Sequence, residues 1–200
     1  SRQSILKTVS ELVNFKPKLA IDIGANVGFW TKDFCETFEK VIAFEPIPSN
    51  VECLKKNVPS TNLEIKEYAL GARNQDTDIF FPQNGNSGSA TFSPSNLVDE
   101  SEIQKVPTKI RTLDDELSNI PDELTQNCLI KIDVQGYEKE VLDGAQKFIL
   151  NFRPIICLEI PKPRKRHKWM KFFDKTHGYK PLMSRKKDWT FVCKNKFPLP

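Results

Sequence analysis

Residues 20–31 read AIDIGANVGFWT, an apolar run that contains one acid and then breaks into glycines just before a helical pattern. This order predicts a buried strand over 19–23 followed by a helix over 27–38. Gly24 has no Cβ, so the backbone can turn sharply there and a ligand can approach closely. Gly28 is expected to let the helix pack against the strand. Because ligands of open α/β sheets bind beyond the carboxyl ends of the strands, this turn is a candidate binding site.

The same alternation of apolar runs and helical patterns continues along most of the chain. Strands and helices that alternate at this spacing predict an α/β fold with a mostly parallel sheet, covered by helices on both faces. The last two apolar runs are joined by a short turn and predict an antiparallel hairpin at the edge of the sheet. Further strands are expected over 41–45, 63–70, 129–134, 154–160, 178–183 and 189–194, with helices over 49–58 and 137–150.

The length of 200 residues suits one domain over 1–200. Apolar residues at helical spacing predict an N-terminal helix within 1–16. Between 72 and 127 the alternation gives way to polar stretches rich in Gly, Ser and Asn, which we expect to form a loop-rich insertion or a lid. No apolar stretch reaches the roughly 18 residues that a membrane span needs.

The five cysteines include no C-x-x-C pair, and the start of the chain lacks the apolar core of a signal peptide. An odd number of cysteines without an export signal favours a reducing compartment. We therefore expect buried free thiols and a cytoplasmic location.

The acids at the ends of the first two predicted strands narrow the choice of ligand. Asp22 would place a carboxylate beside the pocket, and Glu45 follows about 20 residues later, where an acid can accept hydrogen bonds from both hydroxyls of a ribose. The turn reads G-x-x-x-G, without the G-x-G-x-x-G that cradles a pyrophosphate or the lysine of a P-loop. A nucleoside site without a phosphate cradle favours S-adenosylmethionine as the cofactor.

Five stretches carry a resemblance to a known family: DIGANVG (22–28), AFEPIPSN (43–50), YALG (68–71), LIKIDVQGYEKEVLDGA (129–145) and RPIICLEI (153–160). In these motifs the sequence resembles the FkbM family of S-adenosylmethionine-dependent methyltransferases. The resemblance implies the three-layer, Rossmann-like fold of class I methyltransferases, with a seven-stranded sheet. It also implies transfer of a methyl group to a hydroxyl oxygen, with sugars and polyketide-type metabolites as acceptors.

The resemblance further implies a role for individual positions. Glu45 would hold the ribose hydroxyls, and Pro46 would turn the chain out of the second strand. Tyr68 and Ala69 would lie alongside the adenine, and Asp133 would face the reaction centre. The methionyl part of the cofactor would be wrapped by Asp22, Gly24, Ala25, Asn26 and Gly28.

Two departures from the family pattern bear on a metal site. Gln135 stands where the family usually has a glutamate, which removes one expected carboxylate. After Glu159 and Ile160 the chain runs into Pro161, where many relatives have a polar residue or a histidine. Because a metal site needs several converging oxygen ligands, we expect none here.

A base that takes the hydroxyl proton typically speeds such a transfer by about 10²–10⁴-fold. Asp133 is the first candidate, because it ends a strand where burial can raise the pKa of an acid. Glu159 has a similar place on the next strand, and His167 is the third candidate. Each also has a plainer interpretation: Asp133 as the cap of the helix near Gly136, Glu159 as the partner of a basic neighbour, and His167 as part of a solvated basic run.

Basic and aromatic residues interleave over 162–175. Trp169, Phe172 and Phe173 have helical spacing and are expected to pack on the sheet, with the charges on the outer face or at the mouth of the site, where they would attract an acidic acceptor. Three functions remain open: an O-methyltransferase acting on a sugar, a glycan or another small metabolite; a nucleic-acid methyltransferase that binds through this basic segment; and a non-catalytic S-adenosylmethionine-binding module.

Overall fold

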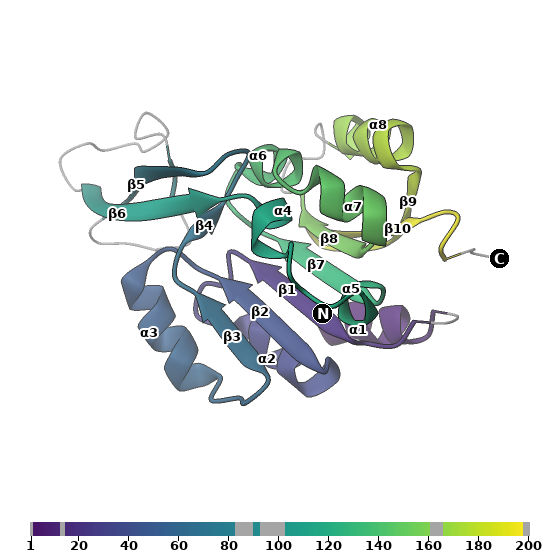
Figure 1. Ribbon diagram of the computed structural model, residues 1–200, viewed down its shortest axis with the longest axis horizontal. Coiled ribbons are helices and arrows are strands. Elements are labelled where there is room, and N and C mark those ends of the chain that lie inside the picture. The colour runs from purple at the N-terminus through teal and green to yellow at the C-terminus, as the bar shows by residue number, and fades with distance from the viewer. Residues whose placement is uncertain (1, 13–14, 83–89, 93–102, 161–165, 198–200) are drawn as a thin grey trace.

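The computed structural model describes residues 2–12, 15–82, 90–92, 103–160 and 166–197. Its centre is a seven-stranded sheet in the order β3-β2-β1-β7-β8-β10-β9 (Figure 1). Neighbouring strands from β3 to β8 are parallel, and β10 is antiparallel to both β8 and β9. This confirms the predicted fold and adds that β10 lies inside the sheet, with β9 at its edge. The strands are β1 (Leu19–Ile23), β2 (Lys40–Phe44), β3 (Leu63–Lys66), β7 (Cys128–Ile132), β8 (Ile155–Glu159), β9 (Tyr179–Arg185) and β10 (Asp188–Cys193).

Helices cover both faces of this sheet, as Figure 1 shows. They are α1 (Arg2–Ser10), α2 (Phe29–Thr37), α3 (Pro48–Asn57), α4 (Leu113–Glu116), α5 (Asp122–Thr125), α6 (Glu138–Asp143), α7 (Gln146–Phe152) and α8 (Arg166–His177). Ile21 and Ile130 pack with α4, α6, α7 and α8, whereas Ala20 and Leu129 pack with α1 and α2 on the other face. This division arises because successive side chains of a strand point to opposite faces.

A second sheet consists of β4 (Ala69–Leu70), β5 (Gln75–Pro82) and β6 (Ile103–Arg111). β5 and β6 pair antiparallel, and β4 pairs parallel with β6. The prediction of one strand over 63–70 is wrong, because β3 ends at Lys66 and the chain then leaves the main sheet to form β4. The predicted insertion therefore contains a β-hairpin that is paired with the chain just before it.

The long helix predicted after β7 is interrupted at Gly144, so the prediction of one helix there is wrong. A Cβ at Gly144 would lie 2.0 Å from the backbone oxygen of Gly71, which shows how closely the chain after β4 passes. Asp114 of α4 then caps the second piece, α7. Its carboxylate accepts hydrogen bonds from two backbone N–H groups of α7, at 2.8 and 3.1 Å. Contacts from the insertion thus divide the helix.

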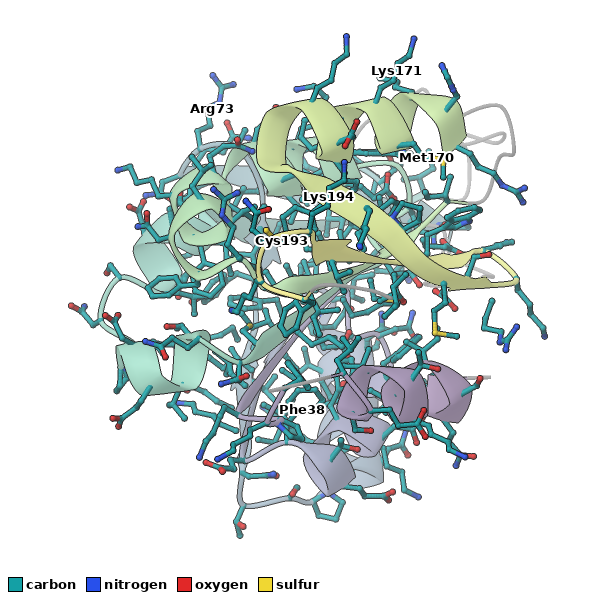
Figure 2. All side chains as sticks on the ribbon, turned by 90° about the vertical axis from the view of Figure 1, so that its right-hand side faces the viewer. Phe38, Arg73, Met170, Lys171, Cys193 and Lys194 are labelled. Carbon is teal, nitrogen blue, oxygen red and sulfur yellow. The ribbon has the colours of Figure 1, made fainter. Side chains whose placement is uncertain are left out.

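The two ends of the chain both pack on the sheet. α1 buries Ile5 and Val9 against the same face as α2. α8 buries Phe173, with Trp169 packed beside it, which confirms the apolar face predicted for the basic segment. Figure 2 shows Lys171 pointing outward from α8.

The structure describes the basic segment only in part, and its helices are short. The start of the basic segment, up to residue 165, lies outside the described residues. Within the described ranges the longest helix is α8, with 12 residues, and none of the helices has the length and apolar character to cross a membrane.

The Asp114→Ala variant is expected to lose about 1 kcal/mol of unfolding free energy, because two N–H groups of α7 lose their acceptor. Urea unfolding followed by circular dichroism measures this loss. Glu123→Ala is the matched control, since Glu123 is an exposed acid in the first turn of α5 with no side-chain cap bond. Equal stability of the two variants would contradict the capping role.

Candidate active site

Three residues of the turn after β1 have positive φ angles, separated by residues that do not. Gly24, Asn26 and Gly28 have φ angles of 78°, 52° and 95°, a region that glycine and, less readily, asparagine adopt. A Cβ at Gly24 would lie 2.1 Å from the backbone oxygen of Asp133. Glycine is therefore required at this position by the close approach of the end of β7.

Gly28 makes a different close contact. A Cβ there would lie 2.6 Å from Cδ1 of Leu54 and 2.9 Å from Cγ2 of Val58. The expectation that Gly28 allows the helix to pack against its strand is wrong, because the nearest neighbours belong to α3 and the residue after it.

Glu45 follows β2 and is buried, with 4% of its surface exposed. Its Oε2 accepts a hydrogen bond from the Asn26 N–H (2.8 Å), and its Oε1 accepts from the Ile47 N–H (3.1 Å) and from Nδ2 of Asn50 (3.1 Å). Burial raises the pKa of Glu45, and these three bonds offset part of the rise. A carboxylate has about four acceptor positions, so about one remains for a ligand. Asn50 lies in the first turn of α3, which begins at Pro48, so this turn of the helix helps to hold Glu45 in place.

A pocket opens between the ends of β1, β2 and β7 and the second sheet. No Lys, Arg or His is among the described residues that line it, whereas two carboxylates are. Much of its wall is apolar and comes from Ile47, Leu70, Ile79 and Phe92. The pocket brings together six residues predicted for the site: Gly24, Asn26, Glu45, Pro46, Ala69 and Asp133.

Part of this wall was missed by sequence reasoning. Ile79 lies on β5, and Phe92 is held near it because Phe80 and Thr91 exchange backbone hydrogen bonds of 2.9 and 2.8 Å. The ring of Phe92 packs on Tyr137, with 4.7 Å between centroids. Tyr137 stands in a recognised motif and could have been found, but Ile79 and Phe92 carry no sequence signal.

The insertion predicted over 72–127 as a loop-rich segment or lid includes a polar stretch over 84–90. Residues 83–89 and 93–102 lie outside the described residues, so between 83 and 102 the structure describes only Ala90, Thr91 and Phe92. Ala90 and Phe92 line the pocket, and the insertion therefore contributes directly to the site.

Asp22, Ala25 and Tyr68 do not belong to the described pocket lining. Asp22 is buried beneath the turn, where its Oδ2 accepts a hydrogen bond of 2.7 Å from the hydroxyl of Thr31 in α2. Burial raises the pKa of Asp22 to about 6. Ala25 packs on the α3 side of the sheet, and the Tyr68 hydroxyl donates a hydrogen bond of 2.5 Å to Glu116.

Asp133 comes directly after β7, and Glu159 is the last residue of the neighbouring strand β8. The two carboxyl groups share a hydrogen bond. Oδ2 of Asp133 lies 3.1 Å from Nζ of the buried Lys131, and its Oδ1 accepts a hydrogen bond of 3.1 Å from Nε2 of Gln135. Burial, together with the negative charge of Asp133, raises the pKa of Glu159 to about 7. The two carboxyl groups are therefore coupled, and as a pair they share one proton close to neutral pH.

Asp133, Glu159 and His167 each had a structural interpretation besides that of a base, and the structure agrees with some of these interpretations and not with others. α6 has no side-chain cap, and the Asp133 carboxylate is engaged by Lys131 and Gln135 instead. Glu159 does have a basic neighbour, with 3.8 Å between its Oε1 and Nζ of Lys187. His167 is exposed on α8 and is not among the residues that line the pocket.

A metal site would need several ligand side chains that converge on one point. Among the residues that the structure describes, no three His, Cys, Asp or Glu side chains converge in a way that could hold a metal ion. The carboxylates at the strand ends are thus engaged by lysine, amide and hydroxyl groups.

A comparison with protein families finds a match that extends over most of the chain. A family model described as "Methyltransferase FkbM domain" matches residues 22–181. The chain is 28% identical to "Methyltransferase 1" of Beauveria bassiana over 142 residues, which are 62% of this chain and 57% of that protein. It is 29% identical to "Hexuronic acid methyltransferase AglP" of Haloferax volcanii over 130 residues, 62% of this chain and 48% of that protein. The chain thus spans about half the length of the curated relatives it matches.

A solved structure shares the fold. The crystal structure of a methyltransferase FkbM from Methylobacillus flagellatus KT superposes with a TM-score of 0.61 at 15% sequence identity. The match covers 91% of this chain and 44% of that one. At this identity the likeness concerns the fold alone.

The Asp22→Asn variant is expected to flatten the pH dependence of stability. The pKa of Asp22 rises from 3.8 to about 6 on folding, so the folded chain binds this proton more tightly than the unfolded chain does. The resulting stabilisation is fully present below about pH 4 and is lost as the pH rises through about 6. Two pKa units correspond to roughly 3 kcal/mol.

Urea unfolding at pH 4 and at pH 7 measures this effect as the difference between the two unfolding free energies. Asp143→Asn is the control, because Asp143 is a partly exposed acid that is paired with Lys139 on α6. If the stability of Asp22→Asn falls with pH as steeply as that of the control, the pKa assigned to Asp22 is wrong.

Proposed function

Because this chain belongs to the FkbM family of methyltransferases, we propose that it transfers a methyl group from S-adenosylmethionine to a hydroxyl oxygen of a sugar or glycan. One observation supports the proposal most directly: Glu45, which can bind a ribose hydroxyl, and Asp133 line the same pocket. Asp133 is the member of the carboxyl pair, Asp133 and Glu159, that faces this pocket. The printed name of the Haloferax volcanii relative, a hexuronic acid methyltransferase, supports an acidic sugar as the acceptor.

The chemistry of the pocket fits this cofactor. Glu45 keeps about one acceptor position for a ribose hydroxyl, and the wall formed by Ile47, Leu70, Ile79 and Phe92 is apolar, as an adenine ring requires. Two carboxylates without a cation in the described lining favour a positively charged ligand over a dinucleotide, whose phosphates need donors or cations. S-adenosylmethionine, when bound, supplies a methyl group on a positively charged sulfur.

The carboxyl pair is the proton acceptor in this proposal. Asp133 is at the pocket surface and Glu159 is hydrogen-bonded behind it, so a hydroxyl beside Asp133 can pass its proton to the pair. Because the two acids are coupled, we assign the proton to the pair and not to one residue.

The remaining expectations belong to the same proposal. The five cysteines are free, but the expectation that all are buried is wrong: Cys35 is half-buried and Cys53 is exposed, whereas Cys128, Cys157 and Cys193 are buried. Free thiols support a reducing, cytoplasmic setting. Ile79 and Phe92 support the idea that the insertion between 72 and 127 closes the cofactor site as a lid.

The direct test measures binding and transfer separately. Calorimetry with S-adenosylmethionine and with NAD examines the pocket, and transfer of a labelled methyl group is then measured into uronic-acid oligosaccharides, neutral sugars, nucleotide sugars and RNA. We expect binding of S-adenosylmethionine and label on a sugar hydroxyl. Label that enters only RNA, with binding that weakens steeply with salt, would favour the nucleic-acid function instead. Binding of NAD alone would refute the proposal.

The Glu45→Gln variant is expected to bind S-adenosylmethionine about 10- to 100-fold more weakly, since a hydrogen bond to a charged acceptor contributes about 1.5–3 kcal/mol. Calorimetry measures the affinity. Glu67→Gln, which alters an exposed acid paired with Lys55, should bind like the unchanged protein. Unchanged affinity in Glu45→Gln would remove Glu45 from the cofactor site.

The Asp133→Asn variant is expected to lower kcat by about 10²–10⁴-fold, because an amide cannot take the hydroxyl proton. Its affinity for S-adenosylmethionine should stay within a few-fold of that of the unchanged protein, because Glu45 and the groups that donate hydrogen bonds to it are unchanged. Initial rates and calorimetry give the two quantities, with Asp143→Asn as the control. A normal kcat would show that Asp133 has only a structural role.

A further inference from the structure

A row of polar side chains crosses the interior of the main sheet. Asp22 on β1, Lys131 on β7, Cys157 on β8 and Thr190 on β10 are successive partners in the strand register. Each has 1% or less of its surface exposed. Lys131 is the one cation of this row, and no other buried cation occurs among the described residues.

The surroundings of Lys131 explain how its charge is tolerated. Its Nζ lies 3.1 Å from Oδ2 of Asp133 and 5.5 Å from the ring centre of Trp30. Burial lowers the pKa of a lysine, but the acidic groups around this one, Asp133 foremost, outweigh burial and raise its pKa. Nζ has no hydrogen-bond partner of good geometry among the described residues, so this side chain acts mainly through its charge.

Gln135 holds the other oxygen of the same carboxylate. Its backbone has a φ of 52°, an uncommon value for glutamine, and its Nε2 donates to Oδ1 of Asp133 at 3.1 Å. Asp133 thus has an ammonium at one oxygen and an amide donor at the other. The two contacts fix the orientation of the Asp133 carboxyl group beside Glu159.

The other charged groups that face the pair cannot replace Lys131. Asp22 on β1 and Asp188 at the start of β10 are acids, and burial raises the pKa of the Cys157 thiol on β8 to about 12, which leaves it uncharged. None of the three supplies a positive charge. Lys187 in the turn before β10 is 3.8 Å from Glu159, but its side chain is 62% exposed and its charge is screened by water.

We infer that Lys131 is a positioning residue for the methyl transfer proposed above: its buried ammonium holds the Asp133 carboxyl group in place beside Glu159 and balances the negative charge of the carboxyl pair. The pair then holds one proton and has one carboxylate ready. The acceptor hydroxyl gives its proton to that carboxylate, and the proton leaves to solvent after transfer. This inference rests on the proposed function, and it adds a residue that does not itself touch the acceptor.

The Lys131→Gln variant tests the inference through the pH dependence of kcat. An opposite charge within about 4–6 Å of a carboxyl favours its ionised form by about 1–3 pKa units. Without the ammonium the pair gains its second proton at higher pH, so the low-pH limb of the kcat profile should move up by about one unit or more. Thr190→Val, an uncharged change in the same buried row, should leave the limb in place.

A second measurement does not depend on activity. NMR titration of ¹³C-labelled Asp and Glu carboxyl groups should show the same upward move of the pair in Lys131→Gln and none in Thr190→Val. If Lys131→Gln does not fold, Gln135→Leu at an exposed position provides a smaller shift in the same direction.

The outcomes separate the two proposals. If the unchanged protein transfers methyl groups to a sugar and the low-pH limb or the carboxyl titration is the same in Lys131→Gln, the role of Lys131 is refuted and the function stands. If the unchanged protein binds S-adenosylmethionine but no acceptor is methylated, the function is refuted, and the role of Lys131 in transfer is refuted with it. If the low-pH limb of the kcat profile moves up in Lys131→Gln while its affinity for S-adenosylmethionine stays normal, both the proposed function and the role of Lys131 are supported.

Discussion

The site depends on one close contact, in which the backbone of Gly24 lies directly against the backbone of Asp133. The N–H of Asp133 donates to the oxygen of Ile23 at 3.0 Å, so the pairing of β1 and β7 continues to the ends of both strands. Because no side chain stands between them, the turn that donates to Glu45 and the Asp133 side chain beyond β7 border the same pocket. A larger residue at position 24 would push these two parts of the site away from each other.

Around this contact the protein buries more charge than a domain of this size usually keeps inside. Asp22, Glu45 and Lys131 all have 4% or less of their surface exposed. Each has partners: a hydroxyl for Asp22, three N–H groups for Glu45 and a carboxylate for Lys131. Buried ion pairs of this kind add little stability compared with apolar packing. Their value here is that each charge is held in a fixed direction at the edge where a ligand binds.

How far the sequence predicts this site depends on how local each contact is. Asn26 and Glu45 follow consecutive strands of one βαβ unit, so their meeting at one edge of the sheet can be expected from the pattern alone. Lys131 was missed, although a lysine in the middle of the apolar run LIKID is itself a sign of a buried partner. Ile79 and Phe92 could not be found, because their place depends on how the hairpin of the insertion packs beside the main sheet. The division of the helix at Gly144 has the same origin, since it depends on the path of the chain at Gly71.

The position of β10 between β8 and β9 governs the order in which the sheet can form. β8 gains its second neighbour only from a strand that ends at Cys193, near the end of these 200 residues. On the ribosome, the half of the sheet that carries Glu159 therefore stays open at one edge until almost all of this sequence has emerged. β1 likewise waits for β7, whose partner residues are more than a hundred positions away, as in Leu19 and Cys128. Such distant pairings slow folding, and strand edges that stay unpaired for longer are exposed to aggregation for longer.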